Sequence, residues 1–412
     1  MKKENRKRLN SKSRSDGKPI VVIGAGSTGS STAYHLAKSG AKVILVDGGE
    51  IAHGMTSKST AIVRTHYSNE IVARMALYSL KILRDFGPIG KSGFVQCGML
   101  VLVPDNLRQY VEANAKMLQR VGIKEMELDR AEAKKMFTDV YLEDCNYFAY
   151  EPESGYADPV QTASSYASKA SELGVEILIR SKVERLSLEG KSVNGVVLDD
   201  QTRIPCDKVI LCTNVWTNKL LERSGVPQEK LLPMRAVPHP VVIYKRPRQF
   251  QGIRPIISDY PSKAYYKSEG QSLLFGGSID ASIDERTVDP DNCPNEVPFE
   301  YISGYSEKMV SRIPPMKDAL YHSSYIGMYD ITPDEHPIID ELSPLGLGGV
   351  FCCVGLSGHG FKLCPAYGIM NAEMILGKES SDQTFDRSYF SLERFRTGKL
   401  LSTKYEGLGS VG

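Results

Sequence analysis

Short apolar segments and helical patterns alternate in the first fifty residues. Ile20–Ile23 is an apolar run of strand length, a glycine-rich turn follows it, and residues 30–39 are predicted as a helix closed by Gly40. A second apolar run at 41–46 ends in Asp47. This order of strand, glycine turn, helix and strand predicts one βαβ unit with parallel strands.

The alternation continues beyond this unit. Apolar residues at helical spacing predict a helix over 69–86, and Asp158-Pro159 has the chemistry of a helix N-cap followed by proline at the first helical position. Asn194-Gly195 is a hairpin turn signal, which we place between strands at 182–188 and 196–198. The remaining strands of this part are predicted at 98–103, 175–179, 208–213 and 349–354, and the remaining helices at 107–120 and 361–376.

Residues 234–325 have a different pattern. Prolines are frequent there, aromatic residues cluster, and helical periodicity is scarce before residues 299–312. We therefore expect an antiparallel sheet that is inserted into the α/β unit formed by the rest of the chain.

Composition narrows the class of protein. The chain has 412 residues, with 51 lysines and arginines against 49 aspartates and glutamates, and 41% of its residues are hydrophobic. This composition is typical of globular proteins, and the balanced charge is unlike that of a nucleic-acid binder. No apolar run approaches the ~20 residues of a membrane-spanning helix. We expect two or three domain-sized units, no transmembrane segment and no nucleic-acid partner.

The basic first 18 residues and the cysteines bear on location. The first 18 residues lack the apolar stretch of a secretory signal, so we predict a disordered leader. The eight cysteines form no C-x-x-C pair and no cluster with zinc-binding spacing. The sequence thus predicts no disulfide framework and no metal site, and a reducing cytoplasm is the expected location.

The clearest chemical motif is Gly24-Ala25-Gly26-Ser27-Thr28-Gly29, between the first strand and the first helix. Its first glycine permits a tight turn, its second allows a pyrophosphate to approach, and its third allows close helix–strand packing. Unpaired N–H groups at the helix start favour the diphosphate. Asp47 is placed to accept hydrogen bonds from a ribose diol. The motif predicts a dinucleotide site and leaves NAD and FAD open. Its residues are Gly24, Gly26, Ser27, Thr28, Gly29 and Asp47.

Further motifs narrow the choice of cofactor. They are the Ser/Thr-rich stretch 56–60 followed by Ile62-Val63-Arg64, the segments 155–159, 209–217 and 328–334, and Gly355-Leu356-Ser357-Gly358-His359-Gly360-Phe361-Lys362. In this order and spacing they resemble the D-amino-acid-oxidase superfamily of FAD enzymes, within it the branch of sarcosine oxidase (β subunit) and glycine oxidase. The resemblance covers about residues 19–380.

The resemblance implies an α/β fold with two domains. A Rossmann-like, glutathione-reductase-type domain would bind FAD, and an inserted antiparallel-sheet α+β domain would bind the substrate and cover the flavin. The expected FAD-binding domain comprises 19–95, 151–233 and 326–380. The expected substrate domain comprises 96–150 and 234–325, and residues 381–412 are expected to form a C-terminal tail.

The resemblance also implies the active-site residues. Arg64 and Lys362 correspond to two cations that hold the substrate carboxylate, a task that suits charge-assisted hydrogen bonds. Tyr329 corresponds to a tyrosine near the substrate. His359 lies in the glycine loop that approaches the flavin pyrimidine edge. The remaining residues assigned to FAD are Ser59, Thr60, Val183, Trp216, Gly355, Gly358 and Gly360, together with Lys362.

The implied reaction is oxidation of the C–N bond of a small amino acid. Sarcosine and other N-alkyl amino acids, proline, glycine and D-amino acids are all open. A neutral amine would transfer a hydride equivalent to the flavin, the resulting imine would hydrolyse, and the electrons would pass to O2 or to an electron-transfer partner. Three alternatives stay open: a flavoenzyme that oxidises a hydroxy acid or glycerol phosphate, a dinucleotide-binding subunit of a larger oxidoreductase complex, and an NAD dehydrogenase.

Three positions depart from the sarcosine oxidase pattern. Gly327 stands where some of these enzymes carry the cysteine that attaches FAD, so we expect non-covalent FAD. Leu274 stands where they carry an O2-activating lysine, which favours a dehydrogenase, or an oxidase that uses another cation such as Lys362. Ala61 replaces an extra arginine of the monomeric enzymes, which favours the β-subunit type and leaves partner subunits open.

Five further histidines and two tyrosines carry weaker signals. Five histidines show no ligand-like pairing and are expected to be structural or exposed. They are His35, His53, His239, His322 and His336. Tyr265 and Tyr266 fit the wall of a substrate cavity and an ordinary sheet face equally well.

Overall fold

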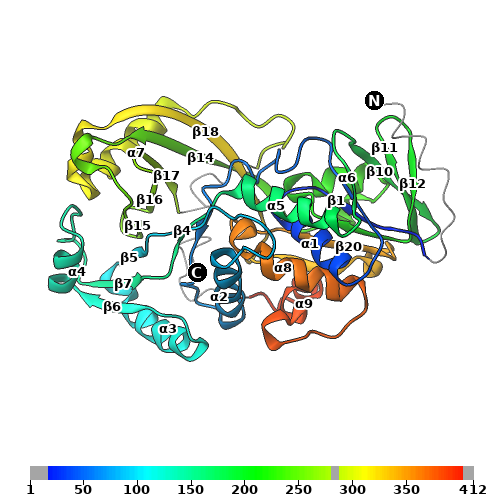
Figure 1. Cartoon of the computed structure of the whole chain (residues 1–412), viewed down its shortest axis with the longest axis horizontal. Helices are drawn as coiled ribbons and strands as arrows, with labels where there is room; N and C mark the ends of the chain where they lie inside the picture. The colour runs from blue at the N-terminus through cyan, green and yellow to red at the C-terminus, as the bar shows by residue number, and fades with distance from the viewer. Residues whose placement is uncertain (1–16, 280–286, 402–412) are drawn as a thin grey trace.

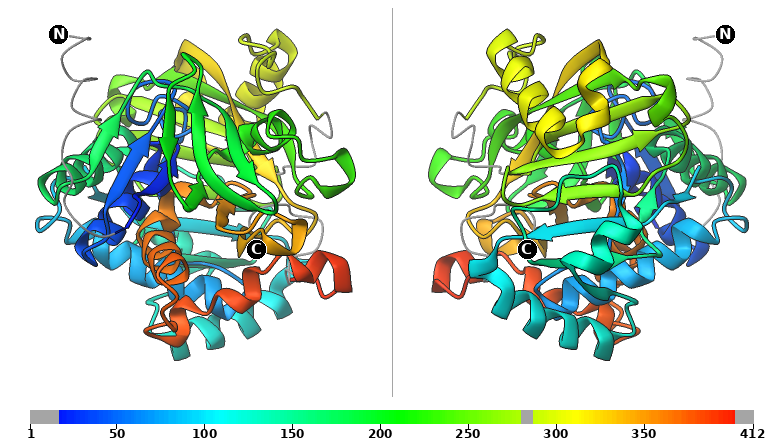
Figure 2. Two further views of the ribbon diagram at one scale, coloured as in Figure 1. Left: turned by 90° about the vertical axis from the view of Figure 1, so that its right-hand side faces the viewer. Right: turned by 90° about the vertical axis from the view of Figure 1, so that its left-hand side faces the viewer.

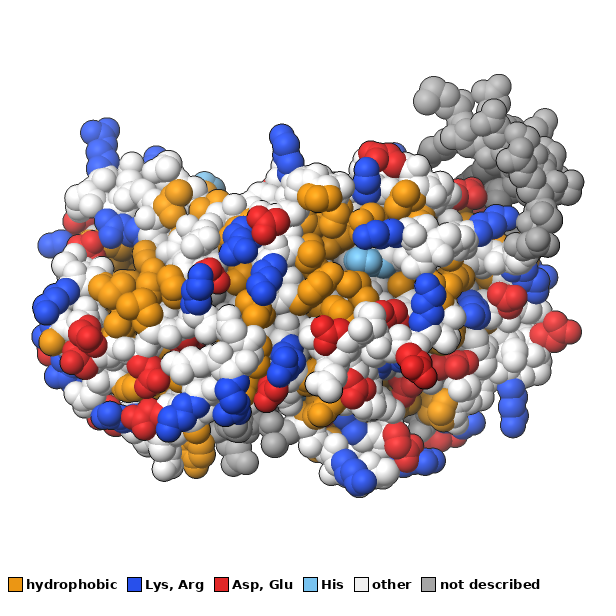
Figure 3. Space-filling view, turned by 60° about the horizontal axis from the view of Figure 1, so that its bottom comes forward, with side chains coloured by type: hydrophobic (Ala, Val, Ile, Leu, Met, Phe, Trp, Pro, Cys, Tyr) orange, Lys and Arg blue, Asp and Glu red, His pale blue; other side chains and the backbone are white. Residues whose placement is uncertain are grey.

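Two large sheets organise the molecule, and the computed structural model describes residues 17–279 and 287–401 of the chain. A six-stranded sheet lies on the right in Figure 1 and an eight-stranded sheet on the left. Figure 2 views the molecule from these two ends: a small antiparallel sheet faces the viewer at one end, and the longest strands and a helix cover the other. Lysine and arginine side chains are interspersed with aspartate and glutamate on the face in Figure 3, as the balanced charge predicts.

The six-stranded sheet contains the predicted βαβ unit. Its order is β19-β20-β13-β1-β2-β9, and all neighbours are parallel except the edge pair β19 and β20. All side chains of β1, β2 and β20 are buried, as is typical of parallel strands covered on both faces. Its strands are β1 (Ile20–Ile23), β2 (Val43–Val46), β9 (Glu176–Leu178), β13 (Lys208–Leu211), β19 (Ile338–Glu341) and β20 (Val350–Val354).

Helices cover one face of this sheet and a small antiparallel sheet covers the other. Val22 and Leu45 pack against the helices, whereas Val21 and Ile44 pack against the small sheet. This is the α/β class that the sequence predicts. The helices are α1 (Ser27–Lys38), α2 (Glu70–Arg84), α5 (Pro159–Glu172) and α8 (Gly360–Ile375). The small sheet consists of β10 (Val183–Glu189), β11 (Ser192–Leu198) and β12 (Arg203–Pro205), with α6 (Thr217–Arg223) beside it.

The hairpin turn predicted at Asn194-Gly195 is wrong. Both residues lie inside β11, and the turn between β10 and β11 is made by Gly190, with φ of +61°, and Lys191. A Cβ at Gly195 would lie 2.9 Å from the Ile204 carbonyl oxygen of β12. Glycine at 195 therefore serves the close approach of a neighbouring strand rather than a turn.

The eight-stranded sheet has the order β18-β14-β17-β16-β15-β5-β7-β6. It joins two segments that are distant in the sequence, and their junction, between β15 and β5, is its only parallel pair. Its strands are β5 (Met99–Val103), β6 (Met126–Asp129), β7 (Tyr147–Glu151), β14 (Arg235–Lys245), β15 (Ile256–Asp259), β16 (Ala264–Glu269), β17 (Leu273–Ser278) and β18 (Leu320–Ile331). Helix α7 (Phe299–Arg312) packs on one face, and α3 (Arg108–Val121) and α4 (Arg130–Met136) lie at the opposite end from β18 (Figure 1).

The described chain passes between the two large sheets four times: between β2 and β5, β7 and β9, β13 and β14, and β18 and β19. A short sheet, formed by β3 (Ile62–Val63), β4 (Val95–Gln96) and β8 (Gly155–Tyr156), fixes the backbone next to Arg64. The domain boundary that we predict at residue 326 lies inside β18, which runs unbroken through this residue as part of the eight-stranded sheet. The division of the chain into domains therefore stays a proposal. Within the described ranges, no helix has the length and apolar character needed to cross a membrane.

Candidate active site

A cavity of about 520 Å³ is lined by residues of both large sheets. It extends from the glycine turn after β1 to the start of α8 and to strands β14, β16 and β18. Fourteen of the predicted site residues line it: Gly24, Gly26, Ser27, Thr28, Asp47, Ser59, Thr60, Arg64, Val183, Trp216, Tyr329, Gly358, Gly360 and Lys362. Three do not: Gly29, Gly355 and His359.

The glycine turn is shaped for close contact. Gly24 has φ of +104°, which favours glycine, and a Cβ there would lie 2.4 Å from the Cys212 carbonyl oxygen. A Cβ at Gly29 would lie 1.8 Å from the Gly24 carbonyl oxygen. Gly29 therefore acts behind the cavity, where helix α1 meets β1. Helix α1 begins at Ser27, three residues before the predicted start, so its first turn borders the cavity.

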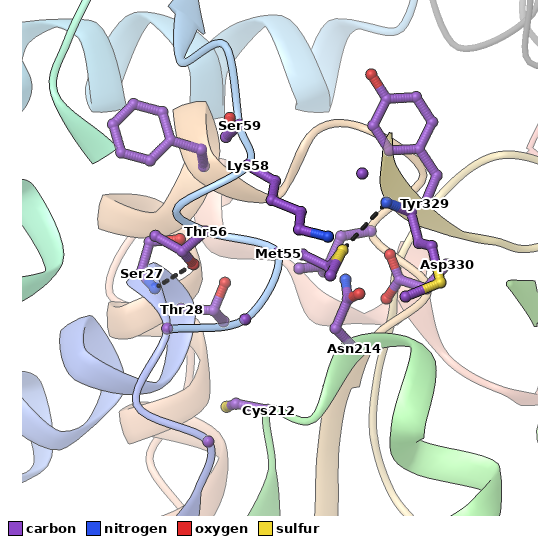
Figure 4. A pocket seen from close by; sticks show the side chains of 18 of the residues that line it. Ser27, Thr28, Met55, Thr56, Lys58, Ser59, Cys212, Asn214, Tyr329 and Asp330 are labelled. Carbon is purple, nitrogen blue, oxygen red and sulfur yellow. Dashed lines mark hydrogen bonds between the residues drawn. The ribbon is translucent and has the colours of Figure 1, made fainter. Parts of the chain in front are cut away.

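Asp47 and Thr56 hold this turn. The two carboxylate oxygens of Asp47 accept hydrogen bonds from the backbone N–H groups of Ala25 and Gly49, both at 2.7 Å. Thr56 Oγ1 accepts from the Ser27 N–H at 3.0 Å (Figure 4). Carboxylate oxygens can accept more than one hydrogen bond, so Asp47 can shape the turn and still bind a ribose.

These features fit a bound dinucleotide. The close-packed glycine turn, the first turn of α1 and the Asp47 carboxylate border the same cavity as the apolar surfaces of Val183 and Trp216. The glycine turn and the first turn of α1 suit a diphosphate, the Asp47 carboxylate suits a ribose, and the surfaces of Val183 and Trp216 suit an adenine ring. The cavity then continues toward Tyr329 and the start of α8, which leaves room for the reactive half of a cofactor.

The two predicted cations lie in that second part of the cavity. Arg64 is buried, stacks over the Tyr67 ring at 4.1 Å and donates to the His66 carbonyl oxygen. Lys362 Nζ donates to the Gly358 carbonyl oxygen at 3.0 Å. Desolvation, and then the charge of Arg64, lower the pKa of Lys362 well below its usual range. Two mutually repelling cations in a shielded cavity provide a strong site for an anion.

His359 lies behind this part of the cavity. Its Nδ1 is 3.0 Å from the Tyr67 hydroxyl oxygen, and Tyr67 in turn lies under Arg64. Burial, followed by the charges of Lys362 and Arg64, holds the pKa of His359 well below its usual range, so the imidazole is neutral. This placement favours a role in supporting Arg64 over direct contact with a substrate.

Gly355 also lies outside the cavity lining. Its N–H donates to Asp330 Oδ2 at 2.7 Å, and a Cβ would lie 2.4 Å from Thr332 Cγ2. Gly355 thus fastens the end of β20 to the last residues of β18, next to Tyr329. Burial raises the pKa of Asp330 to about 6 despite its hydrogen bonds to backbone N–H groups.

Several residues that line the cavity were not identified from the sequence. His53 and His239 were expected to be structural or exposed, yet both line it. Tyr265 also lines it, whereas Tyr266 packs under α7 on the other face of the sheet. Alternation along β16 could have separated the two tyrosines, had the inward face been known. Among the lining residues that the sequence analysis did not assign to the site are His53, Met55, Lys58, Asn214, His239 and Asp330.

Lys58 crosses from the loop after β2 to the eight-stranded sheet. Its Nζ donates to the Ile326 carbonyl oxygen of β18 at 2.9 Å, and Figure 4 shows the side chain extending toward the strand that carries Tyr329. A Cβ at Gly327 would lie 3.6 Å from Lys58 Cβ, an ordinary contact. The loop that covers the glycine turn is therefore tied to the strand that carries Tyr329.

The structure does not support the preference for a dehydrogenase that we based on Leu274. Its side chain packs in the core under α7 with Tyr266 and does not line the cavity. Adjacent residues of a strand point to opposite faces, so Leu274 is directed away from the flavin side of the sheet. The absence of a lysine at 274 therefore does not favour a dehydrogenase over an oxidase.

A buried lysine does lie on the cavity side of this sheet. Lys267 Nζ donates to the Thr60 carbonyl oxygen at 2.9 Å, pairs with Glu269 and lies 4.5 Å from the centre of the Tyr156 ring. Burial lowers its pKa, and Glu269 partly restores it. Lys267 and Lys58 thus attach the covering loop, which carries the FAD-assigned Ser59 and Thr60, to the sheet at two points.

Replacing Lys267 with methionine is expected to raise the dissociation constant of FAD by about 3- to 10-fold, because the covering loop loses a charged hydrogen bond. Methionine keeps the apolar stem but leaves Glu269 without its cation, so the unfolding temperatures of both apoproteins are measured alongside. Fluorescence titration of the apoprotein with FAD measures the change. Lys245→Met, at the exposed end of β14, is the matched control. Unchanged affinity in Lys267→Met would contradict the role assigned to this contact.

The fold and the cavity agree with the comparison to known families. The sequence matches the DAO family, described as FAD dependent oxidoreductase, over residues 19–374. The chain belongs to this family of FAD-dependent oxidoreductases. The predicted superfamily and the predicted cofactor, FAD, are confirmed.

Individual relatives are consistent with the predicted branch. The chain is 23% identical to human mitochondrial sarcosine dehydrogenase over 381 residues, which are 88% of this chain and 40% of that protein. It is 27% identical to sarcosine oxidase subunit beta of an Arthrobacter species, with 93% of this chain and 92% of that protein covered. Among solved structures, L-proline dehydrogenase from P. horikoshii superposes with a TM-score of 0.84 at 25% identity and covers 94% of this chain and 100% of that chain. The chain spans less than half the length of the first of these relatives.

Proposed function

We propose that this protein oxidises the C–N bond of a small amino acid. The observation that carries the proposal is the pair of cations, Arg64 and Lys362, in the same cavity as the dinucleotide turn. A carboxylate bound by both would hold the adjacent C–N bond at a fixed place in that cavity. Relatives named for sarcosine and proline oxidation support an amino-acid substrate.

Other groups of the chain suit the same reaction. Burial, and then neighbouring tyrosines, raise the pKa of Tyr329, so its hydroxyl stays protonated as a hydrogen-bond donor. The start of α8, at Gly358 and Gly360, presents the positive end of a 16-residue helix to the cavity. The cations also disfavour an ammonium group nearby, so they favour binding of the amine in its neutral form. When bound, FAD supplies the acceptor for the hydride equivalent that leaves the substrate.

The electron acceptor and the surroundings of the enzyme are part of the proposal. Similarity to a β subunit supports a role beside partner subunits, with electrons passed to a partner or to O2. All eight cysteines are free thiols, which supports a reducing location such as the cytoplasm.

Anaerobic mixing of the purified, yellow protein with single substrates tests the proposal. At least one of sarcosine, L-proline, glycine and D-alanine is expected to bleach the blue absorbance band of the flavin. L-lactate and glycerol 3-phosphate should leave it unchanged. Acid precipitation should release FAD into the supernatant, because Gly327 offers no side chain for attachment. Bleaching by a hydroxy acid or glycerol phosphate alone would establish the alternative flavoenzyme reaction instead.

A further inference from the structure

Three aromatic rings form a wall on the cavity side of the eight-stranded sheet. The His239 ring stacks on Tyr329 with centroids 4.4 Å apart and an interplanar angle of 24°. On its other side lies Tyr265, nearly parallel at 8°, with its hydroxyl oxygen 3.4 Å from His239 Nε2. All three residues line the cavity that contains Arg64 and Lys362. We call these three residues the aromatic wall.

Two glycines make this wall possible. Gly327 pairs with His239 across β18 and β14, so the residue directly opposite His239 has no side chain, and Tyr329, two residues further along β18, stacks on the imidazole. On β17, a Cβ at Gly277 would lie 3.1 Å from both Cε1 and the hydroxyl oxygen of Tyr265. Because Gly277 has no side chain, the Tyr265 ring can lie across β17 toward His239. The wall is therefore a built feature of four neighbouring strands, β18, β14, β17 and β16.

His239 is the polar centre of the wall. It is 8% exposed, and burial lowers its pKa to about 4, so the ring is neutral at ordinary pH. A neutral imidazole has one donor and one acceptor nitrogen. When Nε2–H donates to the Tyr265 hydroxyl, Nδ1 becomes the acceptor, and Nδ1 has no hydrogen-bond partner in the described part of the chain. In this tautomer His239 offers the cavity a neutral acceptor in addition to the two cations.

We propose that His239 Nδ1 accepts a hydrogen bond from the N–H of the substrate amine and thereby selects amino acids over their oxygen analogues. This inference rests on the proposed oxidation of an amino acid. The two ends of the substrate are then recognised by different chemistry: the carboxylate by Arg64 and Lys362, and the N–H by a neutral acceptor. An ether or ester oxygen at the same place has no hydrogen to donate and faces the lone pair of Nδ1.

Two isosteric probes and two variants test the inference on the FAD-loaded enzyme. Sarcosine carries the N–H, and methoxyacetate carries an ether oxygen in its place. His239→Phe keeps a flat ring between the tyrosines but has no acceptor, whereas His239→Gln keeps an acceptor. Stopped-flow flavin reduction gives the rate and dissociation constant for sarcosine, and the flavin band shift gives the dissociation constant for methoxyacetate. If only L-proline reduces the flavin, it replaces sarcosine and tetrahydrofuran-2-carboxylate replaces methoxyacetate.

His239→Phe is expected to lower the ratio of reduction rate to dissociation constant for sarcosine by about 10-fold, the effect of one hydrogen bond in a shielded site. Methoxyacetate should bind within about two-fold of wild type, and His239→Gln should recover most of the loss. His322→Phe, at an exposed position of β18, should change neither the kinetics with sarcosine nor the dissociation constant of methoxyacetate. Equal losses for both probes, or equal losses in the Phe and Gln variants, would overturn the inference.

Two further results complete the test. If His239→Phe does not retain FAD, Tyr265→Phe replaces it, because it removes only the hydroxyl that faces Nε2. In Tyr265→Phe the ratio of reduction rate to dissociation constant for sarcosine should fall by about 3-fold, while the dissociation constant of methoxyacetate should stay unchanged. If the two probes were affected equally, the inference would be overturned. A wild-type enzyme that no amino acid reduces would refute the proposed function, and this inference with it.

Discussion

Replacing Arg64 or Lys362 with alanine is expected to lower kcat/KM for the amino-acid substrate by about 10- to 150-fold. Each substitution removes a charge-assisted hydrogen bond to the carboxylate, worth about 1.5–3 kcal/mol. Steady-state kinetics with the substrate found by flavin bleaching measure the loss. Lys378→Met, at an exposed position beyond α8, is the control for loss of a lysine. Unchanged kinetics in either alanine variant would remove that residue from the carboxylate site.

The pH dependence separates the two cations. Desolvation and Arg64 lower the pKa of Lys362, so this lysine loses its proton at lower pH than an exposed lysine. A carboxylate binds the protonated form, and its affinity is therefore full below the pKa of Lys362 and falls as the pH rises through it. Lys362→Ala should abolish that fall, while Arg64→Ala should move it to higher pH, because the repelling charge is gone.

Replacing Arg394 with methionine is expected to lower the free energy of unfolding by about 3–5 kcal/mol at neutral pH, because it leaves a buried carboxylate without its cation. Arg394 lies in α9 (Glu393–Thr397) and donates from Nε and Nη2 to Asp334 at 2.7 and 3.0 Å. Their side chains are only 5% and 1% exposed. Denaturant unfolding of both proteins measures the difference. Arg396→Met is the control, since Arg396 pairs with Glu393 at the surface and should change stability by less than about 0.5 kcal/mol.

The stability difference should also depend on pH. Burial alone would raise the pKa of Asp334, but hydrogen bonds and the charge of Arg394 outweigh burial and hold it below its ordinary value. The wild-type stabilisation is therefore present above that ordinary value and is lost only as the pH falls through the lowered pKa. In Arg394→Met only weaker influences, such as the hydrogen bond from the Leu401 N–H, still oppose burial, so Asp334 becomes protonated at a higher pH. The two proteins should approach each other in stability under mildly acidic conditions, and a difference that grows on acidification would contradict this account.

Secondary structure that is determined by a few neighbouring residues could be predicted from the sequence. The strand at Ile20–Ile23, the turn after it and the second strand before Asp47 were predicted correctly because each is encoded by a few neighbouring residues. The Asp158-Pro159 helix start was also correct, and the Asp158 side chain accepts from the Gln161 N–H. The hairpin at Asn194-Gly195 was wrong because another glycine a few residues earlier makes the turn, and sequence spacing cannot rank two such candidates.

Features that depend on strand pairing could not be predicted in the same way. His239 and Gly327 are 88 residues apart, and only the register of β14 with β18 places them side by side. The parallel contact of β15 with β5 likewise merges two distant segments into one sheet. The candidate site residues Arg64 and Lys362, which line the same cavity, were proposed through motifs that the chain shares with a family, since nothing in their local sequence requires them to meet.

The pairing of β14 with β18 extends over the whole of β14. Tyr329 and His239 are held in this ladder by hydrogen bonds at fixed register, and the insertion of one residue into β18 would turn Tyr329 to the opposite face. Exchange of individual side chains on this frame is therefore expected to change substrate preference more readily than insertions or deletions, the usual route to diversity in loop-built pockets. The one register shift of the ladder lies between Ile243 and Tyr244, away from His239 and Tyr329.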